Sequence, residues 1–380
     1  MFHFNFNKMR DVKMKNTTVF VEGVSDSELD SLTESIKNVF LKSTNNLEWL
    51  SPGDSVLLKP ALNSPDSYPS TTHPLSIKII SEILAEKGAK VFIGDQSGLK
   101  DVLHDPSGVI HGNTHDNYIK SEMGSIDDEF TSFESESWDD GFIHYQSKHT
   151  LSWPHGFYVT KWVKKVDHII NLPRLSSHSQ AGATLGFKNM VGILRDDSRM
   201  DFHANGPFNN FIKNEAHGSS LKSIDDKSDT FIEKIVEISD SIKEKLRLTL
   251  FVATKAQATF GPNRNALQIG KLEFGKAHIV DLKPGLVFAS ADQVSTESFA
   301  LALLKDIRKS MPFLHKLYPR LILFSNKNVN NIDKIPIRDL KFIQHAMDIG
   351  LGQMPDNIVY KNVPDTLKSR LNGYLDESHE

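Results

Sequence analysis

The strongest constraint on the fold is a strand–helix–strand pattern between residues 53 and 98. An apolar run, SVLLKPAL, ends in Lys59 and Pro60, and a loop rich in turn-forming residues follows it. Pro74 begins a stretch with the apolar spacing of an amphipathic helix, which Gly88 ends. The run AKVFIGDQSG predicts a second strand. Two strands joined in this way pair in parallel, with a right-handed crossover.

Strands and helices alternate along the rest of the chain. The fold class that we expect is therefore α/β, with a mostly parallel or mixed sheet and helices on both faces. An arrangement in two lobes around a crevice is compatible with this pattern. The run LKPGLVFASADQ predicts another strand of the sheet, and a helix follows it at 294–307. Further helices are expected at 157–165, 230–246 and 333–348, and a polar loop at 194–207.

We divide the chain into three parts. Residues 1–50 form an N-terminal strand–helix segment, residues 51–310 form the main α/β domain, and residues 311–380 form a C-terminal helical segment that packs on it. The pattern weakens at 99–152, where the stretch from Ser121 to Asp140 has eight acidic residues and no Lys or Arg. We expect an inserted, mostly solvated lobe there.

Composition excludes several classes of site. The net charge of −4 argues against a protein that binds nucleic acid through its phosphates. The chain has no Cys, so it has no disulfide, no thiolate zinc site and no iron–sulfur cluster, and any metal is held by His, carboxylate or backbone oxygen. No segment has the apolar length of a membrane span or the core of a secretory signal. We expect a cytoplasmic protein with a small-molecule ligand, and the sequence leaves the oligomeric state open.

Polar residues gather where the strand at 166–172 ends, which is how open α/β sheets form ligand sites. His178 is the candidate acid or base, because the pKa of imidazole suits proton transfer at neutral pH. Lys188 lies among apolar neighbours, where an ammonium group loses pKa and becomes a candidate nucleophile or phosphate ligand. A His178 bonded to backbone and a Lys188 at the surface are the structural alternatives.

A second set of polar residues follows strands or lies in the same region. We expect these side chains to bind the substrate: Lys59, Asn63, Asp95, Arg174, Asn189, Arg199 and Asp292. For Lys59 the alternative is an ammonium group that reaches water, and for Asp95 it is a turn cap. Arg199 has Asp neighbours that favour ordinary ion pairs.

Several blocks together resemble one family, the domain-of-unknown-function 362 (DUF362) proteins. The blocks are GDSVLLKPALN (53–63), THPLSIKIISEILAEKGAKVFIGDQSG (72–98), IINLPRLSSHSQAGATLGFKNMVG (169–192), GLVFASADQVSTESFA (285–300) and HAMDIGLGQ (345–353). The resemblance implies the α/β fold but no established reaction. Where the family pattern has Lys and an acidic residue, this chain has Ser176 and Val252.

A fainter likeness extends to the nickel-pincer lactate racemases. The positions of His178, Lys188 and His203 are 10 and 15 residues apart, similar to the spacing of that family's acid/base His, cofactor-tethering Lys and metal-ligating His. The likeness implies that His203 binds a metal, nickel or another ion. Three functions follow. The first is an enzyme that acts on a small anionic molecule, carboxylate or phosphate, through a His/Lys site. The second is a non-catalytic ligand-binding or partner protein, and the third is a nickel-pincer-type isomerase.

Overall fold

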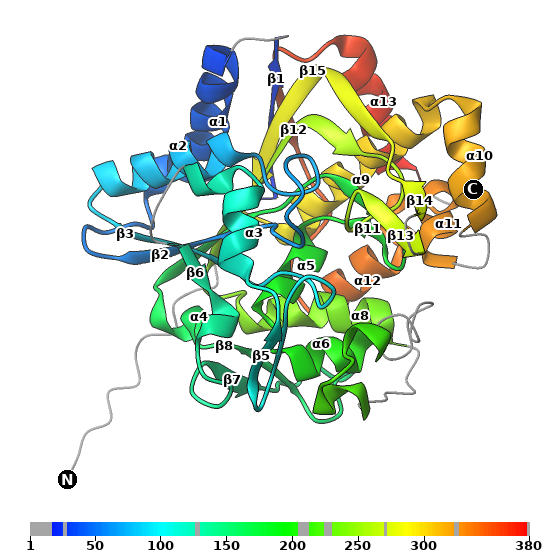
Figure 1. Cartoon of the computed structure of the whole chain (residues 1–380). Helices are drawn as coiled ribbons and strands as arrows, with labels where there is room; N and C mark the ends of the chain where they lie inside the picture. The colour runs from blue at the N-terminus through cyan, green and yellow to red at the C-terminus, as the bar shows by residue number, and fades with distance from the viewer. Residues whose placement is uncertain are drawn as a thin grey trace.

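One large mixed sheet organises the chain, which is described here by a computed structural model (Figure 1). The structure describes residues 17–25, 29–125, 130–203, 213–223, 230–269, 272–322 and 327–377. In order across the sheet, the strands of its main path are β16 (Ile358–Lys361), β1 (Val19–Val24), β15 (Ile279–Ser290), β12 (Leu246–Gln257), β9 (His168–Leu172), β2 (Ser55–Pro60), β3 (Lys90–Asp95) and β6 (Phe130–Ser132).

Strand direction confirms the mostly parallel, mixed sheet. The strands β12, β9, β2, β3 and β6 are parallel neighbours, and β1 is parallel to β16. On the main path β15 runs the other way, because it pairs antiparallel with both β1 and β12. The sheet thus takes strands from all three parts of the sequence, since β1 and β16 come from its two end segments.

The expected strand–helix–strand unit is confirmed in β2, α2 (Pro74–Glu86) and β3. The two strands pair in parallel, with Ser55 opposite Lys90. Pro74 occupies the first turn of α2, where its missing N–H leaves no helical bond unmade. The His73 ring accepts a hydrogen bond from the backbone N–H of Leu75 and caps this helix.

Helices cover both faces of the sheet, as expected. On one face, α1 (Leu29–Ser43) and α2 pack through Ile36, Phe40 and Ile80. On the other face, α8 (Phe231–Glu237), α9 (Gln293–Ser310), α12 (Lys341–Asp348) and α13 (Asp365–Asp376) contribute to a second core that includes Phe299 and Ile343. Each fully buried side chain of this kind stabilises the fold by about 1.5–3 kcal/mol. Figure 1 shows α1 and α2 together, away from α8, α9 and α12.

The segment at 99–152 differs from the expected solvated lobe. Its strand β6 joins the edge of the sheet, and Tyr118, Phe133 and Phe142 are buried. The acidic composition of this stretch suggested solvent exposure, although its aromatic residues are buried. The remaining elements of this segment are β4 (Leu103–Asp105), β5 (Gly108–His111), α3 (Thr114–Lys120) and β7 (Phe142–Tyr145).

Three further expectations on elements need correction. Residues 157–165 form β8 (Phe157–Thr160) and the short α4 (Trp162–Lys165) in place of one helix, because Phe157 pairs with Tyr145 of β7 in a hairpin. The expected polar loop contains the helix α6 (Asp196–His203). The helix expected at 230–246 is only α8, followed by a 3-10 turn to Ser241.

The other elements lie around the central sheet. They are β10 (Ser176–His178), β11 (Gly182–Thr184), α5 (Gly186–Asn189), the hairpin of β13 (Asn265–Ile269) and β14 (Leu272–Lys276), α10 (Phe313–Ile322) and α11 (Lys327–Lys334). β10 pairs with β11 and touches β12, so it extends the sheet beyond the end of β9. Among the described residues, no helix is long and apolar enough to cross a membrane.

Candidate functional site

The carboxyl ends of three parallel strands bring predicted site residues to one edge of the sheet. Lys59 of β2 lies opposite Asn171 of β9, and Asp95 ends the adjacent β3. The chain leaves β9 through Pro173 to Arg174. Open α/β sheets bind ligands at this edge. A polar side chain at this edge can bind a ligand when its hydrogen-bonding groups have no partner within the protein.

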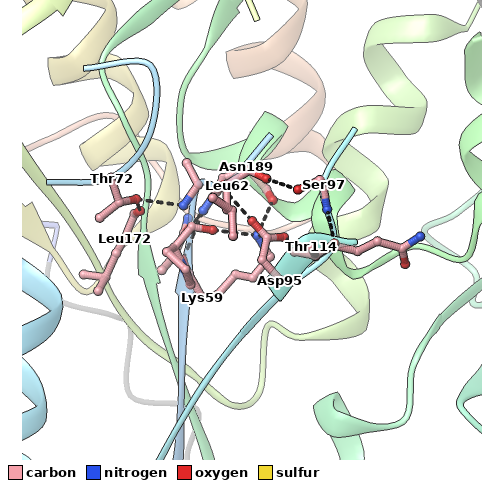
Figure 2. A network of polar contacts seen from close by, with 12 residues as sticks. Lys59, Leu62, Thr72, Asp95, Ser97, Thr114, Leu172 and Asn189 are labelled. Atoms are coloured by element: carbon pink, nitrogen blue, oxygen red, sulfur yellow. Dashed lines mark hydrogen bonds and ion pairs between the residues drawn. The ribbon is translucent and has the colours of Figure 1, made fainter. Parts of the chain in front are cut away.

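The polar contacts of Lys59 are made within the protein. Its Nζ lies 2.8 Å from Asp95 Oδ1 and donates to Pro60 O at 2.8 Å and to Asn189 O at 3.0 Å. Burial lowers the pKa of Lys59, while the carboxylate of Asp95 opposes that shift. Figure 2 shows this network at close range. The three acceptors match the three N–H groups of the ammonium, so Lys59 connects the carboxyl ends of β2 and β3 to α5.

Neighbouring groups in Figure 2 extend this network. Asp95 Oδ2 accepts from Leu62 N at 2.8 Å, so the same carboxylate also fixes the loop after β2. Thr72 Oγ1 accepts from Ala61 N at 2.7 Å and donates to Leu172 O. These bonds make the edge of the sheet rigid before any ligand is present.

Asn63 and Asn189 also have protein partners. Asn189 Nδ2 donates to Asn171 Oδ1 at 2.7 Å and to Lys59 O at 3.2 Å. Asn63 Nδ2 donates to Asn263 Oδ1 at 2.7 Å, away from this network. Their roles as substrate ligands stay predictions, and the observed bonds are structural.

Arg199 is buried and bonded to the backbone. Its guanidinium donates to Leu194 O at 3.0 Å, to Gln96 O at 3.1 Å and to Ser97 O, and Asp196 lies 3.5 Å from its Nε. Helix α6 places it there. Arg199 therefore makes an ion pair with a neighbouring Asp, which was the structural alternative to substrate binding.

Arg174 is the exception in this set. The residue is 1% exposed, and none of its three guanidinium nitrogens has a hydrogen-bond partner in the described part of the chain. Burial lowers its pKa to about 10, although Asp66 and Asp95 oppose the shift. A buried guanidinium without acceptors is unfavourable by several kcal/mol, of order ~3. Its donors are therefore available to an anionic ligand.

Lys188 lies in the electrostatic field of Arg174. Burial first, and then repulsion from Arg199 and Arg174, lowers the pKa of Lys188 to about 7. The ammonium lies 5.2 Å from the centre of the Phe202 ring. The side chain is only partly buried, so it is reachable from solvent. A neutral amine is therefore accessible near neutral pH, and burial is the main cause.

His178 has a fixed tautomer. Its Nδ1 accepts from the backbone N–H groups of Gln180 at 3.0 Å and Ala181 at 3.2 Å, so in the neutral ring Nε2 carries the proton. Burial and then repulsion from Lys188, before two weaker cationic neighbours, lower the pKa of His178 well below its ordinary value. The ring is thus a neutral donor at pH 7. We refer to His178 and the three groups whose charge opposes its protonation, Lys188, His203 and Arg174, as the cluster.

His203 completes the cluster. Its Nδ1 lies 3.0 Å from Gln180 Oε1, so Gln180 contacts both imidazoles, one through its backbone and one through its side chain. Burial and repulsion from Lys188 and Arg199 lower the pKa of His203 well below its ordinary value. In the described ranges, no three His, Asp or Glu side chains are grouped closely enough to hold a metal ion. Metal binding by His203 stays a prediction.

Asp292 follows the carboxyl end of β15, where Ser290 lies opposite Thr249 of β12. Asp292 caps α9 there, accepting from Ser295 N at 2.8 Å and from Gln353 N at 3.2 Å. These bonds are structural, and a role of Asp292 in substrate binding stays a prediction.

Sequence reasoning missed the positioning roles of Glu297 and Gln180. Glu297 reaches from α9 to the backbone N–H groups of Gly186 and Phe187, which begin α5. One signal was available, because Glu297 shares the apolar face of its helix with Ala300, Leu301 and Leu304. Gln180 gave no such signal.

Comparison with known proteins identifies the family. The pattern of a domain of unknown function (DUF362) matches residues 56–302. The chain belongs to the DUF362 family. A thylakoid-associated protein from Synechocystis sp. (strain ATCC 27184 / PCC 6803 / Kazusa) is 26% identical over 182 residues, which cover 46% of this chain and 50% of that protein. The chain thus spans half the length of this curated relative. No solved structure matches this chain.

The DUF362 match contains the whole cluster of Arg174, His178, Lys188 and His203, and it also contains both departures noted in the sequence. Ser176 is fully buried and donates to Ser177 O at 2.8 Å. Val252 is buried in the core beneath α1 and α2. The Val252 departure therefore leaves an apolar side chain in an apolar core.

Proposed function

We propose that this DUF362 protein is an enzyme that acts on a small anionic molecule, a carboxylate or a phosphate. The unpartnered guanidinium of Arg174 is the observation that carries the proposal. Proteins seldom bury an arginine without acceptors, since the uncompensated charge is costly. A carboxylate or phosphate supplies two parallel acceptors to a guanidinium and neutralises its charge.

Lys188 is the group to which we assign the chemistry. An amine with a pKa of about 7 provides a neutral form at physiological pH, suited to proton abstraction or to attack on a carbonyl. An anion bound at Arg174 lies in the same electrostatic field. In this scheme His178 binds the substrate through its Nε2–H, because Nδ1 is already occupied by two backbone donors.

A non-catalytic ligand-binding protein is the second candidate. The fixed Nδ1 of His178 favours it, since a ring that keeps this acceptor bonded cannot readily cycle its proton. The two candidates share the Arg174 site. They differ in whether a bound anion is transformed at Lys188.

Calorimetric titration with inorganic phosphate and malonate tests the shared site. We expect the wild-type protein to bind one of these anions, and Arg174→Gln to bind it at least about tenfold more weakly, the value of one charge-assisted pair. Arg370→Gln is the matched control, because the Arg370 guanidinium is exposed and pairs with Asp306 at 2.8 Å. Equal affinity in wild type and Arg174→Gln would reject the site.

Turnover then separates the two candidates. Lys188→Met keeps Arg174 and should bind the anion as the wild type does. With a panel of 2-oxo acids and phosphate esters, we expect products from the wild type by mass spectrometry and none from Lys188→Met. Anion binding without turnover in the wild type would favour the non-catalytic alternative.

A further inference from the structure

A cavity of about 400 Å³ lies among the C-terminal helices, and its lining includes Ser177 and His178 of β10. It is bounded by the end of α9, by α10 and α11, by α13 and by β10. Figure 1 shows α10 and α11 at the right of the molecule, with α5 nearer its centre. Cavities of a few hundred cubic ångströms, about 300–1,000 Å³, accommodate small-molecule ligands.

Basic side chains outnumber acidic ones around this cavity. The charged residues that line it are Lys305, Arg308, Lys309, Lys316 and Lys334, with Asp333 and Glu377. Five bases and two acids leave a surplus of three positive charges, with both lining histidines counted as neutral. The overall charge of the chain is −4, so this concentration of positive charge is local.

The two acids are already paired. Arg308 Nε and Nη2 donate to the two carboxylate oxygens of Asp333, each at 2.8 Å. Lys305 lies 3.4 Å from Glu377 and also donates to Ile335 O at 2.9 Å.

The other three ammonium groups belong to Lys309, Lys316 and Lys334. They have no carboxylate partner within the described residues. Lys316 Nζ donates to the backbone carbonyl of Lys309, which brings these two lysines together.

The wall of the cavity is preorganised. Arg308 Nη1 donates to Ser177 Oγ at 2.9 Å, and Ser177 Oγ donates to Ala258 O at 2.7 Å. This chain of bonds holds the paired arginine against β10 and β12. The lysines at the rim therefore face a fixed polar surface, and a multiply charged anion would relieve their mutual repulsion.

We propose that this cavity is a second anion-binding site, specific for a polyanion of the phosphate class, with Lys309, Lys316 and Lys334 as its ligands. A single carboxylate would leave most of the surplus charge uncompensated. A diphosphate group carries enough charge to match three lysines. The proposal uses neither Arg174 nor Lys188, which do not line this cavity, although His178 lines it.

Titration calorimetry with inorganic pyrophosphate at low ionic strength tests this site. Lys309→Gln/Lys316→Gln removes two of the three charges, and we expect at least about tenfold weaker binding. Lys341→Gln/Lys368→Gln is the control with the same change in net charge, since these lysines pair with Glu233 and Asp365 elsewhere on the surface. The control should bind within about twofold of the wild type.

The outcomes distinguish the two anion sites. Arg174→Gln should retain pyrophosphate binding at the cavity. Loss of pyrophosphate binding in Arg174→Gln alone would place the ligand at the first site and overturn this proposal, while leaving the proposed function intact. Absence of pyrophosphate binding in the wild type, or equal weakening in both lysine double variants, would also overturn it.

Discussion

The carboxyl group of Glu297 accepts a hydrogen bond from the backbone N–H of Gly186 at 2.7 Å. The same oxygen accepts a second bond from Phe187 N at 3.3 Å. Helix α9 thereby holds the first turn of α5, which carries Lys188. Burial raises the pKa of Glu297 to about 8, although the two N–H groups oppose the shift. The carboxyl group is therefore mostly protonated at neutral pH.

Glu297→Gln should keep the fold and remove a pH dependence. Between pH 4.5 and about 8, the unfolded chain has lost the Glu297 proton while the folded chain retains it, so wild-type stability falls as pH rises through this window. Gln keeps an acceptor for Gly186 N and has no proton to lose. Urea unfolding at pH 5 and pH 8 should show a smaller decrease in the free energy of unfolding for Glu297→Gln. Identical decreases in both proteins would contradict this.

Glu297→Ala tests the positioning role. It leaves the N–H groups of Gly186 and Phe187 without acceptors, and we expect a loss of about 1–3 kcal/mol in the free energy of unfolding. Hydrogen exchange of α5 should become faster. If Glu297→Ala were as stable as Glu297→Gln, the carboxyl group would not hold α5.

Lys188 should react with amine reagents at unusually low pH. Its pKa of about 7 lies well below the ordinary 10.5 because of burial and the nearby guanidinium groups. Competitive acetylation followed by peptide mass spectrometry should give a midpoint near pH 7 for Lys188. Lys341, whose side chain is 62% exposed, serves as the reference residue. A shared midpoint for both residues would remove Lys188 as the reactive amine.

Arg174 and Arg199 should respond in opposite directions to the same substitution. Arg174→Met removes a buried charge that has no partner, so we expect the free energy of unfolding to increase by about 1–3 kcal/mol. Arg199→Met removes the cation beside Asp196 and leaves the carbonyls of Leu194, Gln96 and Ser97 without their Arg199 donor, and should decrease it by about 3–5 kcal/mol. Thermal melts of both variants provide the measurement. Destabilisation of both proteins to the same extent would mean that Arg174 has a structural partner.

His178 should remain neutral at pH values where an ordinary histidine becomes protonated. Its two backbone donors select the tautomer with the proton on Nε2, and burial with nearby cations opposes a second proton. Long-range nitrogen–proton NMR spectra of the imidazole report both the tautomer and its titration. His178→Ala identifies the signal. A midpoint near the ordinary pKa of histidine would exclude this assignment.

The fold was largely predictable because its strands and helices have strong local patterns. β2, α2 and β3 follow directly from apolar spacing and from Pro74 and Gly88. Direction was not predictable for β15, since its sequence is equally suited to either pairing. The aromatic residues at 99–152 were misjudged because their burial depends on contacts with distant strands, which local acidity conceals.

The site was predictable as a region but not as a set of roles. The strand ends indicated where Lys59, Asp95 and Arg174 lie in the fold. The sequence cannot, however, distinguish a cationic side chain that has protein hydrogen-bond acceptors from one that has none. That distinction depends on contacts across more than a hundred residues, such as Lys59 with Asn189. The burial of the neighbours of Lys188 was predictable, because these apolar residues are local in sequence, and its catalytic role stays a prediction.

The most direct test of the account is to locate an anion at Arg174. Crystals soaked in selenate, a phosphate analogue that scatters anomalously, should show a peak within hydrogen-bond distance of the Arg174 guanidinium. The same peak should be missing from crystals of Arg174→Met. An Arg174 side chain bonded to protein acceptors, with no selenate beside it, would contradict the central claim.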